Sequence, residues 1–313
     1  MTDSATGTPA DRTFCIVTAA DRRMLPAACC ALLSARDNVR LDNVSYYLIG
    51  SDLDDEDRGK LFEFSRANGI VITLVEMSEK NLGDEELRRY GKASLGRLHM
   101  PELLPASFDR VLYLDADVLV LGDIGELVVK DIDGKPLAAV QALTVGKIDK
   151  LRRRKIALGL DEGDPYFNSG VMLFDWKKTL EGEFLQRAYH RLNGTRRFDA
   201  PDQDVLNQVF HRNWHRLDFA WNMKAAYLSL EPQTRIIHFY GVSKPWSARA
   251  KYSLGRFRDI YRQELNATWP GFVKDPGALK NILLILEYPG FMMKMRWRRR
   301  QARLYYFGRN AGR

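Results

Sequence analysis

Cysteine is scarce in this chain of 313 residues, which contains only Cys15, Cys29 and Cys30. An odd number of cysteines excludes a fully paired disulfide framework, and their spacing matches no metal-binding pattern. We therefore expect reduced thiols in a cytoplasmic protein, buried as ordinary core residues.

Long apolar runs are missing as well. None approaches the roughly 18–20 residues that a membrane-spanning helix requires, so we expect any membrane contact to be peripheral. Residues 1–12 are polar and include acidic side chains, unlike a signal peptide. We predict that this stretch is a short disordered tail.

The chain also lacks a glycine-rich phosphate loop after its first predicted strand, residues 13–20. The following turn belongs to the sequence AADRRM, residues 19–24, which contains no glycine. This absence argues against a nucleotidyltransferase or sugar-nucleotide pyrophosphorylase. That class stays an alternative because it also combines carboxylates, a metal and an α/β nucleotide domain, and a non-catalytic binding protein is a second alternative.

Positive charge is concentrated near the C-terminus. The net charge is +8, but residues 244–313 carry a surplus of +12, which leaves −4 for residues 1–243. After Pro289 and Gly290, which we expect to break the chain's regular structure, a basic helix with aromatic anchors is predicted over residues 291–307. Such a segment is typical of contact with an anionic membrane, with a solvated helix docked on its own domain as the alternative. Basic patches with aromatic residues also bind nucleic acid, but we expect no such partner here. The anchors are Phe291, Trp297, Tyr305, Tyr306 and Phe307.

Strand-like and helix-like segments alternate along the first two thirds of the chain. This pattern predicts an α/β fold with a mostly parallel sheet flanked by helices. The basic segment 147–163 interrupts the alternation, and we predict a mobile loop or lid there. Predicted strands cover 13–20, 44–50 and 70–76, and predicted helices cover 25–34, 54–68 and 94–104.

The apolar run from Arg110 ends in Asp115 and Asp117, which flank Ala116. Open α/β sheets place their ligands at the carboxyl ends of such strands. On an extended chain, side chains two residues apart lie on the same face, so both carboxylates could reach one Mg²⁺ or Mn²⁺ ion. The alternative is a strand followed by an ordinary aspartate turn.

Three later segments place polar side chains at element boundaries. Asn168 precedes an apolar run, and Asp202 is a candidate N-cap of a helix that begins near residue 201. His238 ends a short strand and is followed by Gly241 and Lys244, which suit an anion. Each of these residues could also serve a purely structural role.

Together the four segments resemble glycosyltransferase family 8, a retaining group that includes bacterial lipooligosaccharide galactosyltransferases and glycogenin. The resemblance runs from about Phe14 to Trp246 through the motifs LYLDADVLV, YFNSGVMLF, DQDVLN and HFYGVSKPW. It implies a GT-A fold, which is Rossmann-like, a UDP-hexose donor and a divalent cation, usually Mn²⁺ with Mg²⁺ as the other option.

Matching motif positions assign expected roles to individual residues. Asp115, Asp117 and His238 are the expected metal ligands. The expected catalytic residues around the donor hexose are Asn168, Asp202 and Gln203. The remaining donor-binding residues are Ala19, Ala20 and Asp21 for uridine, Arg97 for the sugar and phosphate, Ala116 between the two aspartates, and Gly241 and Lys244 for the diphosphate.

Two positions depart from the family pattern. Gln141 occupies the place of an aspartate that helps to hold the sugars in related galactosyltransferases, and Arg22 and Arg23 replace a more usual polar pair. Donor and acceptor choice are therefore open, and a single hydroxyl separates glucose from galactose.

The combined prediction is an enzyme that moves galactose or glucose from UDP to a hydroxyl of a glycan or glycolipid. We expect it at the inner face of the cytoplasmic membrane. No carboxylate is an obvious nucleophile, so we expect front-face attack by the acceptor hydroxyl, with a diphosphate oxygen taking its proton. The predicted organisation is a tail over 1–12, a GT-A domain over 13–246 and a basic, aromatic extension over 247–313.

Overall fold

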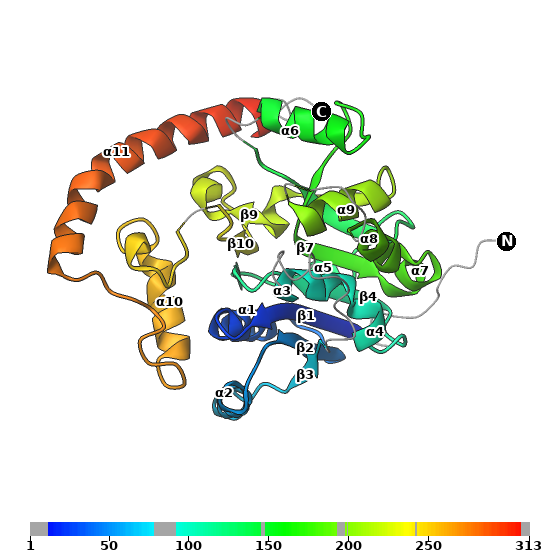
Figure 1. Ribbon diagram of the computed structural model, residues 1–313, viewed down its shortest axis with the longest axis horizontal. Coiled ribbons are helices and arrows are strands. Elements are labelled where there is room, and N and C mark those ends of the chain that lie inside the picture. Colours follow the sequence, from blue (N-terminus) through cyan, green and yellow to red (C-terminus); the bar gives the residue numbers. More distant parts are fainter. Residues whose placement is uncertain are drawn as a thin grey trace.

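The computed structural model describes residues 12–77, 92–144, 148–192, 198, 200–241 and 243–307. Its centre is a seven-stranded sheet in the order β3-β2-β1-β4-β7-β6-β8. Figure 1 shows β3, β2, β1, β4 and β7 of this sheet, with helices around them. Strands β3, β2, β1 and β4 are parallel neighbours, β7 runs antiparallel to β4 and β6, and β8 is parallel to β6. The predicted α/β fold with a mostly parallel sheet is confirmed. The strands are β1 (Phe14–Asp21), β2 (Val44–Ser51), β3 (Ile72–Glu76), β4 (Arg110–Leu114), β6 (Leu137–Gln141), β7 (Phe167–Asp175) and β8 (His215–Leu217).

Helices cover both faces of this sheet because its central strands are apolar on both sides. Every residue of β1 is buried except Asp21 at its end. One hydrophobic cluster joins the sheet to α1 (Leu25–Asp37) and α10 (Gly255–Leu265), and a second joins it to α8 (Phe184–Leu192) and α9 (Pro201–Val209). The other helices are α2 (Asp55–Asn68), α3 (Lys92–Leu95), η4 (Gly96–Leu98), α4 (Met100–Leu103), α5 (Gly125–Val128), α6 (Ile148–Ala157), α7 (Trp176–Glu181), η5 (Phe219–Trp221), η6 (Ala225–Leu230), η7 (Ala248–Ala250), α11 (Ala278–Ala302) and η8 (Arg303–Phe307).

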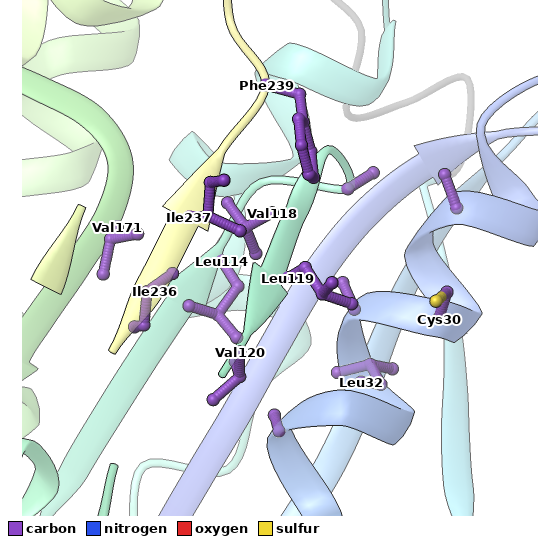
Figure 2. Close-up of a cluster of buried hydrophobic side chains, with 14 of the residues drawn as sticks. Cys30, Leu32, Leu114, Val118, Leu119, Val120, Val171, Ile236, Ile237 and Phe239 are labelled. Carbon is purple, nitrogen blue, oxygen red and sulfur yellow. The ribbon is translucent and has the colours of Figure 1, made fainter. Parts of the chain in front are cut away.

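A small second sheet positions the motif residues. It consists of β5 (Val118–Val120), β10 (Ile236–His238) and β9 (Met223–Lys224), with β10 in the middle. The antiparallel register pairs His238 with Val118, directly after the aspartate motif. Figure 2 shows the apolar side chains of β5 and β10 packed together beside α1, and these side chains belong to the main core cluster. The packing of short strands therefore brings His238 to Asp117.

The aspartate motif lies in a turn and not on an extended strand. Strand β4 ends at Leu114, and the amide of Val118 donates to the carbonyl of Asp115 at 3.2 Å. The prediction that the two carboxylates share one face of an extended chain was wrong in its geometry. The turn separates the two sheets, so Asp115 and Asp117 lie at the junction between them.

Two more local predictions need correction. Within the predicted loop 147–163, residues Ile148–Ala157 form α6, while Lys147 lies outside the described residues. The predicted helix over 94–104 is divided among α3, η4 and α4.

The three cysteines are free and buried, as predicted. Residues 1–11 of the predicted tail lie outside the described part of the chain.

Helix α11 runs through Pro289 without a break, although the sequence suggested one there. Proline removes one backbone donor and crowds the preceding turn, which favours bending. Figure 1 shows α11 as a long curved helix that extends from the side of α10 toward α6. Tyr306, a predicted membrane anchor, is buried, and its hydroxyl lies 3.1 Å from the amide nitrogen of Thr144. Among the described helices, none is long and apolar enough to cross a bilayer.

Candidate active site

Asp115, Asp117 and His238 form a compact cluster at the junction of the two sheets. One ligand atom from each residue lies within 4.8 Å of the others. Nε2 of His238 is 3.1 Å from Oδ1 of Asp117 and 3.5 Å from Oδ2 of Asp115. Two carboxylates and an imidazole suit Mn²⁺ or Mg²⁺, so the donor set fits the expected divalent cation.

Gly170, on β7, makes this convergence sterically possible. A Cβ atom added there would lie 2.0 Å from Cε1 of His238 and 2.8 Å from Oδ2 of Asp115. The carbonyl of Gly170 also accepts the amide of Asp115 at 2.8 Å, which fixes the start of the turn. Any larger side chain at this position would push the histidine and the aspartate apart. The sequence showed a glycine in YFNSGVMLF but not this role.

Asn222 determines how His238 presents its ring. Its Oδ1 lies 2.9 Å from Nδ1 of the histidine, and its Nδ2 donates to Oδ1 of Asn168 at 2.8 Å. The amide nitrogen of Asn222 is used by Asn168, so its oxygen is the acceptor for an Nδ1–H. This leaves Nε2, which faces the two aspartates, as the ring nitrogen that could bind a metal. Asn222 is buried and no sequence motif identified it.

The pKa values of the two aspartates shift in opposite directions. Burial raises the pKa of Asp115 above its ordinary value, although Arg97 and His238 oppose this. Burial acts in the same direction on Asp117, but His238 and Lys244 outweigh it and hold the Asp117 pKa below its ordinary range. Two carboxylates that share one site commonly diverge in this way. The ammonium of Lys244 also donates to the other oxygen of Asp117 and to the carbonyl of Phe239 at 3.1 Å.

Arg97 connects the aspartate motif to the start of α9. It donates to Oδ1 of Asp115 at 2.7 Å and forms an ion pair with Asp202 at 3.0 Å. It also donates to the carbonyl of Ser169 at 2.9 Å, and only 6% of its side chain is exposed. Asp202 is therefore a partner of Arg97 and not the predicted N-cap, since Ala200 occupies that position and makes no side-chain cap.

Gln203 and Asn168 form the polar wall beside this ion pair. Oε1 of Gln203 accepts from Nδ2 of Asn168 at 2.9 Å and from the amide of Ser169 at 3.2 Å. Nε2 of Gln203 donates to the hydroxyl of Tyr166 at 3.2 Å. Both amide side chains are thus held in one orientation next to the carboxylates. The structure brings all three predicted catalytic residues together with the predicted metal ligands.

The predicted uridine-binding residues lie at the carboxyl end of β1. Ala19 and Ala20 are buried. Gly96, the residue before Arg97, packs against Ala19, since a Cβ added at Gly96 would lie 3.0 Å from the Cβ of Ala19. Asp21 accepts hydrogen bonds from the amides of Arg23 and Met24, which closely follow it in the chain. This strand end therefore adjoins the Arg97 segment.

Two further predicted donor-binding residues are Ala116, between the two aspartates, and Gly241, three residues after His238. Ala116 is buried within the aspartate turn. Gly241 has a positive φ of 62°, which a residue with a side chain rarely adopts. Gln141, at the end of β6, is partly buried and pairs with Phe167 of β7 in the sheet.

The chain is similar to known proteins over the segments that form this site. The family described as "Glycosyl transferase family 8" matches residues 15–250. General stress protein A of Bacillus subtilis is 28% identical over 284 residues, which cover 82% of this chain and 95% of that protein. A lipopolysaccharide 1,2-glucosyltransferase of Escherichia coli K12 is 26% identical over 74% of this chain and 72% of its own length. A lipopolysaccharide 1,3-galactosyltransferase of Salmonella typhimurium is 26% identical over 70% of this chain and 67% of its own length.

A solved structure supports the fold independently. The galactosyltransferase LgtC, in complex with donor and acceptor sugar analogs, superposes with a TM-score of 0.66 at 21% identity. The match covers 80% of this chain and 95% of that chain, which confirms the predicted GT-A architecture. Because the family match spans most of the sequence, including the aspartate turn, Gly170, Asp202 and His238, the chain belongs to glycosyl transferase family 8 and is a glycosyltransferase.

Proposed function

We propose that the protein is a retaining glycosyltransferase that moves glucose or galactose from a UDP-hexose to a hydroxyl of a glycan or glycolipid. The observation that carries the proposal is the convergence of Asp115, Asp117 and His238 beside Lys244. Relatives whose names specify glucosyl or galactosyl transfer to lipopolysaccharide support the hexose and the acceptor class. Membership of the family leaves the pyrophosphorylase alternative without support.

Asp115, Asp117 and His238 are the proposed ligands of Mn²⁺ or Mg²⁺. When bound, such a cation supplies Lewis-acid stabilisation of the charge that develops on the departing diphosphate. Lys244 contributes a second positive charge to the same group, and the bare backbone at Gly241 permits close approach of phosphate oxygens. Ala19, Ala20 and Asp21 are proposed to bind the uridine at the adjoining strand end.

The residues around the donor hexose favour front-face attack. Asp202 is compensated by Arg97 and accepts a hydrogen bond from the hydroxyl of Ser169 at 3.3 Å, so its carboxylate is a weakened nucleophile. Gln203 is a neutral amide whose oxygen already accepts two hydrogen bonds. We infer that Asn168, Asp202 and Gln203 orient the hexose, while an oxygen of the leaving diphosphate accepts the proton of the acceptor hydroxyl.

The outer face of α11 supports a peripheral site on an anionic membrane, at its cytoplasmic side. Leu286 and Met293 are each 71% exposed, and Trp297 is 54% exposed. These residues are seven and four positions apart, which places them on one side of the helix. Arginines at 296, 300 and 303 lie beside them and suit anionic headgroups. This stripe extends the proposed contact at 291–307 toward the start of the helix.

UDP should bind only weakly without a divalent cation. We expect Mn²⁺ to tighten UDP binding to the wild-type protein in isothermal titration calorimetry, and Asp117→Asn to weaken it by at least about tenfold, or 1.4 kcal/mol. The matched control is Asp55→Asn, because Asp55 is a fully exposed carboxylate on α2. Metal-independent UDP binding, or none at all, contradicts the proposed donor class.

Loss of the Asn222 side chain should weaken the metal site. We expect Asn222→Ala to lower Mn²⁺ affinity by about 10–100-fold, because the His238 ring loses its orienting acceptor. Asn222→Asp retains an acceptor for Nδ1–H and should keep most of the affinity. Mn²⁺ binding is measured by electron paramagnetic resonance on variants whose thermal melting matches the wild type. Equal affinity for the alanine variant and the wild type excludes this role.

No covalent glycosyl intermediate should accumulate on the protein. Incubation with UDP-glucose or UDP-galactose and Mn²⁺, without an acceptor, is expected to leave the intact mass unchanged. A hexosyl adduct mapped to Asp202 by peptide mass spectrometry is the result that rejects front-face attack in favour of a double displacement.

Vesicle binding should depend on the exposed stripe of α11. We expect the double variant Leu286→Glu and Trp297→Glu to reduce flotation with phosphatidylglycerol vesicles several-fold, and added salt to weaken wild-type binding. Phe62→Glu is the matched control, because Phe62 is 70% exposed on α2. Equal loss in the control, or none in the double variant, argues against this membrane-facing surface.

A further inference from the structure

A cavity of about 540 Å³ lies between α11 and the segment that follows His238. Its wall includes Gly241 and Ser243 on one side and Leu284, Phe291 and Met295 on the other. A second hollow of about 590 Å³ shares Arg249, Leu284 and Glu287 with the first and follows the first turns of α11. The shared residues make the two hollows neighbours along one path beneath the helix.

The cavity has an apolar wall and a positive rim. Leu284, Phe291, Met292 and Met295 supply aliphatic and aromatic surface from α11. Arginines at 249, 298 and 299 line the same space, opposed by a single carboxylate, so the ionisable side chains sum to +2. Within the described part of the chain, none of these three arginines lies within 4.0 Å of a carboxylate oxygen. The guanidinium groups therefore remain available to an anion.

A hydrogen bond to the backbone holds one arginine of the rim in place. Nε of Arg299 donates to the carbonyl of Ala226 at 3.1 Å, which fixes the side chain against η6 and leaves its terminal nitrogens for a ligand. Arg298 is partly buried, and its charge opposes the rise that burial causes in the pKa of Tyr227 of the same segment. Arg298 and Arg299 are thus partly buried in the cavity wall, whereas Arg249 at its rim and Arg300 on the same helix are exposed.

The two hollows extend from Gly241, which lies near the catalytic region, to the exposed apolar start of α11. Gly241 is three residues after His238, so their Cα atoms are no more than about 11 Å apart, the reach of an extended chain. At the other end, the second hollow is lined by Leu279 and Leu283, which are 75% and 50% exposed. A ligand along this path would have a polar end near the cluster of Asp115, Asp117 and His238 and an apolar end near the molecular surface.

We propose that this cavity binds the phosphate-bearing lipid part of the acceptor, with the phosphate at the arginines and a single alkyl or prenyl chain along Leu284 toward Leu279. The proposal rests on the proposed function and narrows its acceptor to a lipid-linked phosphate. A bare oligosaccharide would leave the apolar wall uncovered, and an uncharged lipid would leave the arginines without an anion.

The test uses dodecyl phosphate, below its critical micelle concentration, titrated into the full chain without UDP. We expect saturable binding that Arg298→Gln and Leu284→Gln each weaken about tenfold. The matched controls, Arg300→Gln and Leu286→Gln, change residues of the same helix that do not line either cavity and should stay within twofold of wild type. Dodecyl maltoside and inorganic phosphate, which each retain half of the chemistry, should bind at least tenfold more weakly.

Several results overturn the proposal. Equal losses in lining and control variants indicate adsorption on the outside of α11, and equal affinity for inorganic phosphate indicates a simple anion site. With Mn²⁺ added, the ³¹P signal of bound dodecyl phosphate should broaden more in the wild type than in Asp117→Asn, and equal broadening in the two proteins removes the link to the acceptor. Intact Mn²⁺-dependent UDP binding without dodecyl phosphate binding rejects this cavity alone and leaves the proposed transferase standing.

Discussion

The constraint on which the site depends is the burial of three carboxylates in one place. Asp115, Asp117 and Asp202 have side chains that are 21%, 11% and 17% exposed. A buried charge costs several kcal/mol unless it is paired, and Arg97 and Lys244 supply two positive charges for three negative ones. The three carboxylates thus exceed these two cations by one negative charge. Burial raises the pKa of Asp115, and the neighbouring Asp117 and Asp202 add to that rise. A cluster that is one cation short has the electrostatics that a divalent ion satisfies.

Meeting this constraint requires segments that are far apart in the chain. His238 is the last residue of β10, a strand of three residues that pairs with β5 on one side and β9 on the other. Such short strands have little stability of their own, but Ile236, Ile237 and Phe239 are fully buried in the main core (Figure 2). Hydrophobic packing therefore sets the position of His238, and the absence of a Cβ at position 170 allows the close approach. The geometry of the site is a consequence of the core.

The sequence predicted those features that depend on neighbouring residues. Continuous apolar runs identified the central strands, and the predicted helix over 54–68 is α2, which Asp54 caps by exchanging hydrogen bonds with Asp57. The predictions failed where distant residues decide the outcome. Asp202 has the chemistry of an N-cap, yet Arg97 attracts it into an ion pair, and Pro289 is accommodated inside a helix. Asn222 lies 16 residues before its histidine partner, and only the pairing of β9 with β10 brings the two together, so no local pattern could reveal it.

Arg258 links the loop that contains Lys244 to the segment that precedes α11. It is buried on α10 and donates to the carbonyls of Pro245 and Lys274, each at 3.0 Å, and to the carboxylate of Asp275. Pro245 follows Lys244, which contacts Asp117, whereas residues 274 and 275 lead directly into α11. The Arg258 guanidinium thus ties the loop that contains Lys244 to the segment that leads into α11. Helix α11 has the exposed apolar stripe on its outer face and lines the cavity with its inner face. Because the inner and outer faces belong to the same helix, the proposed membrane contact and the proposed acceptor cavity would move together relative to the donor site.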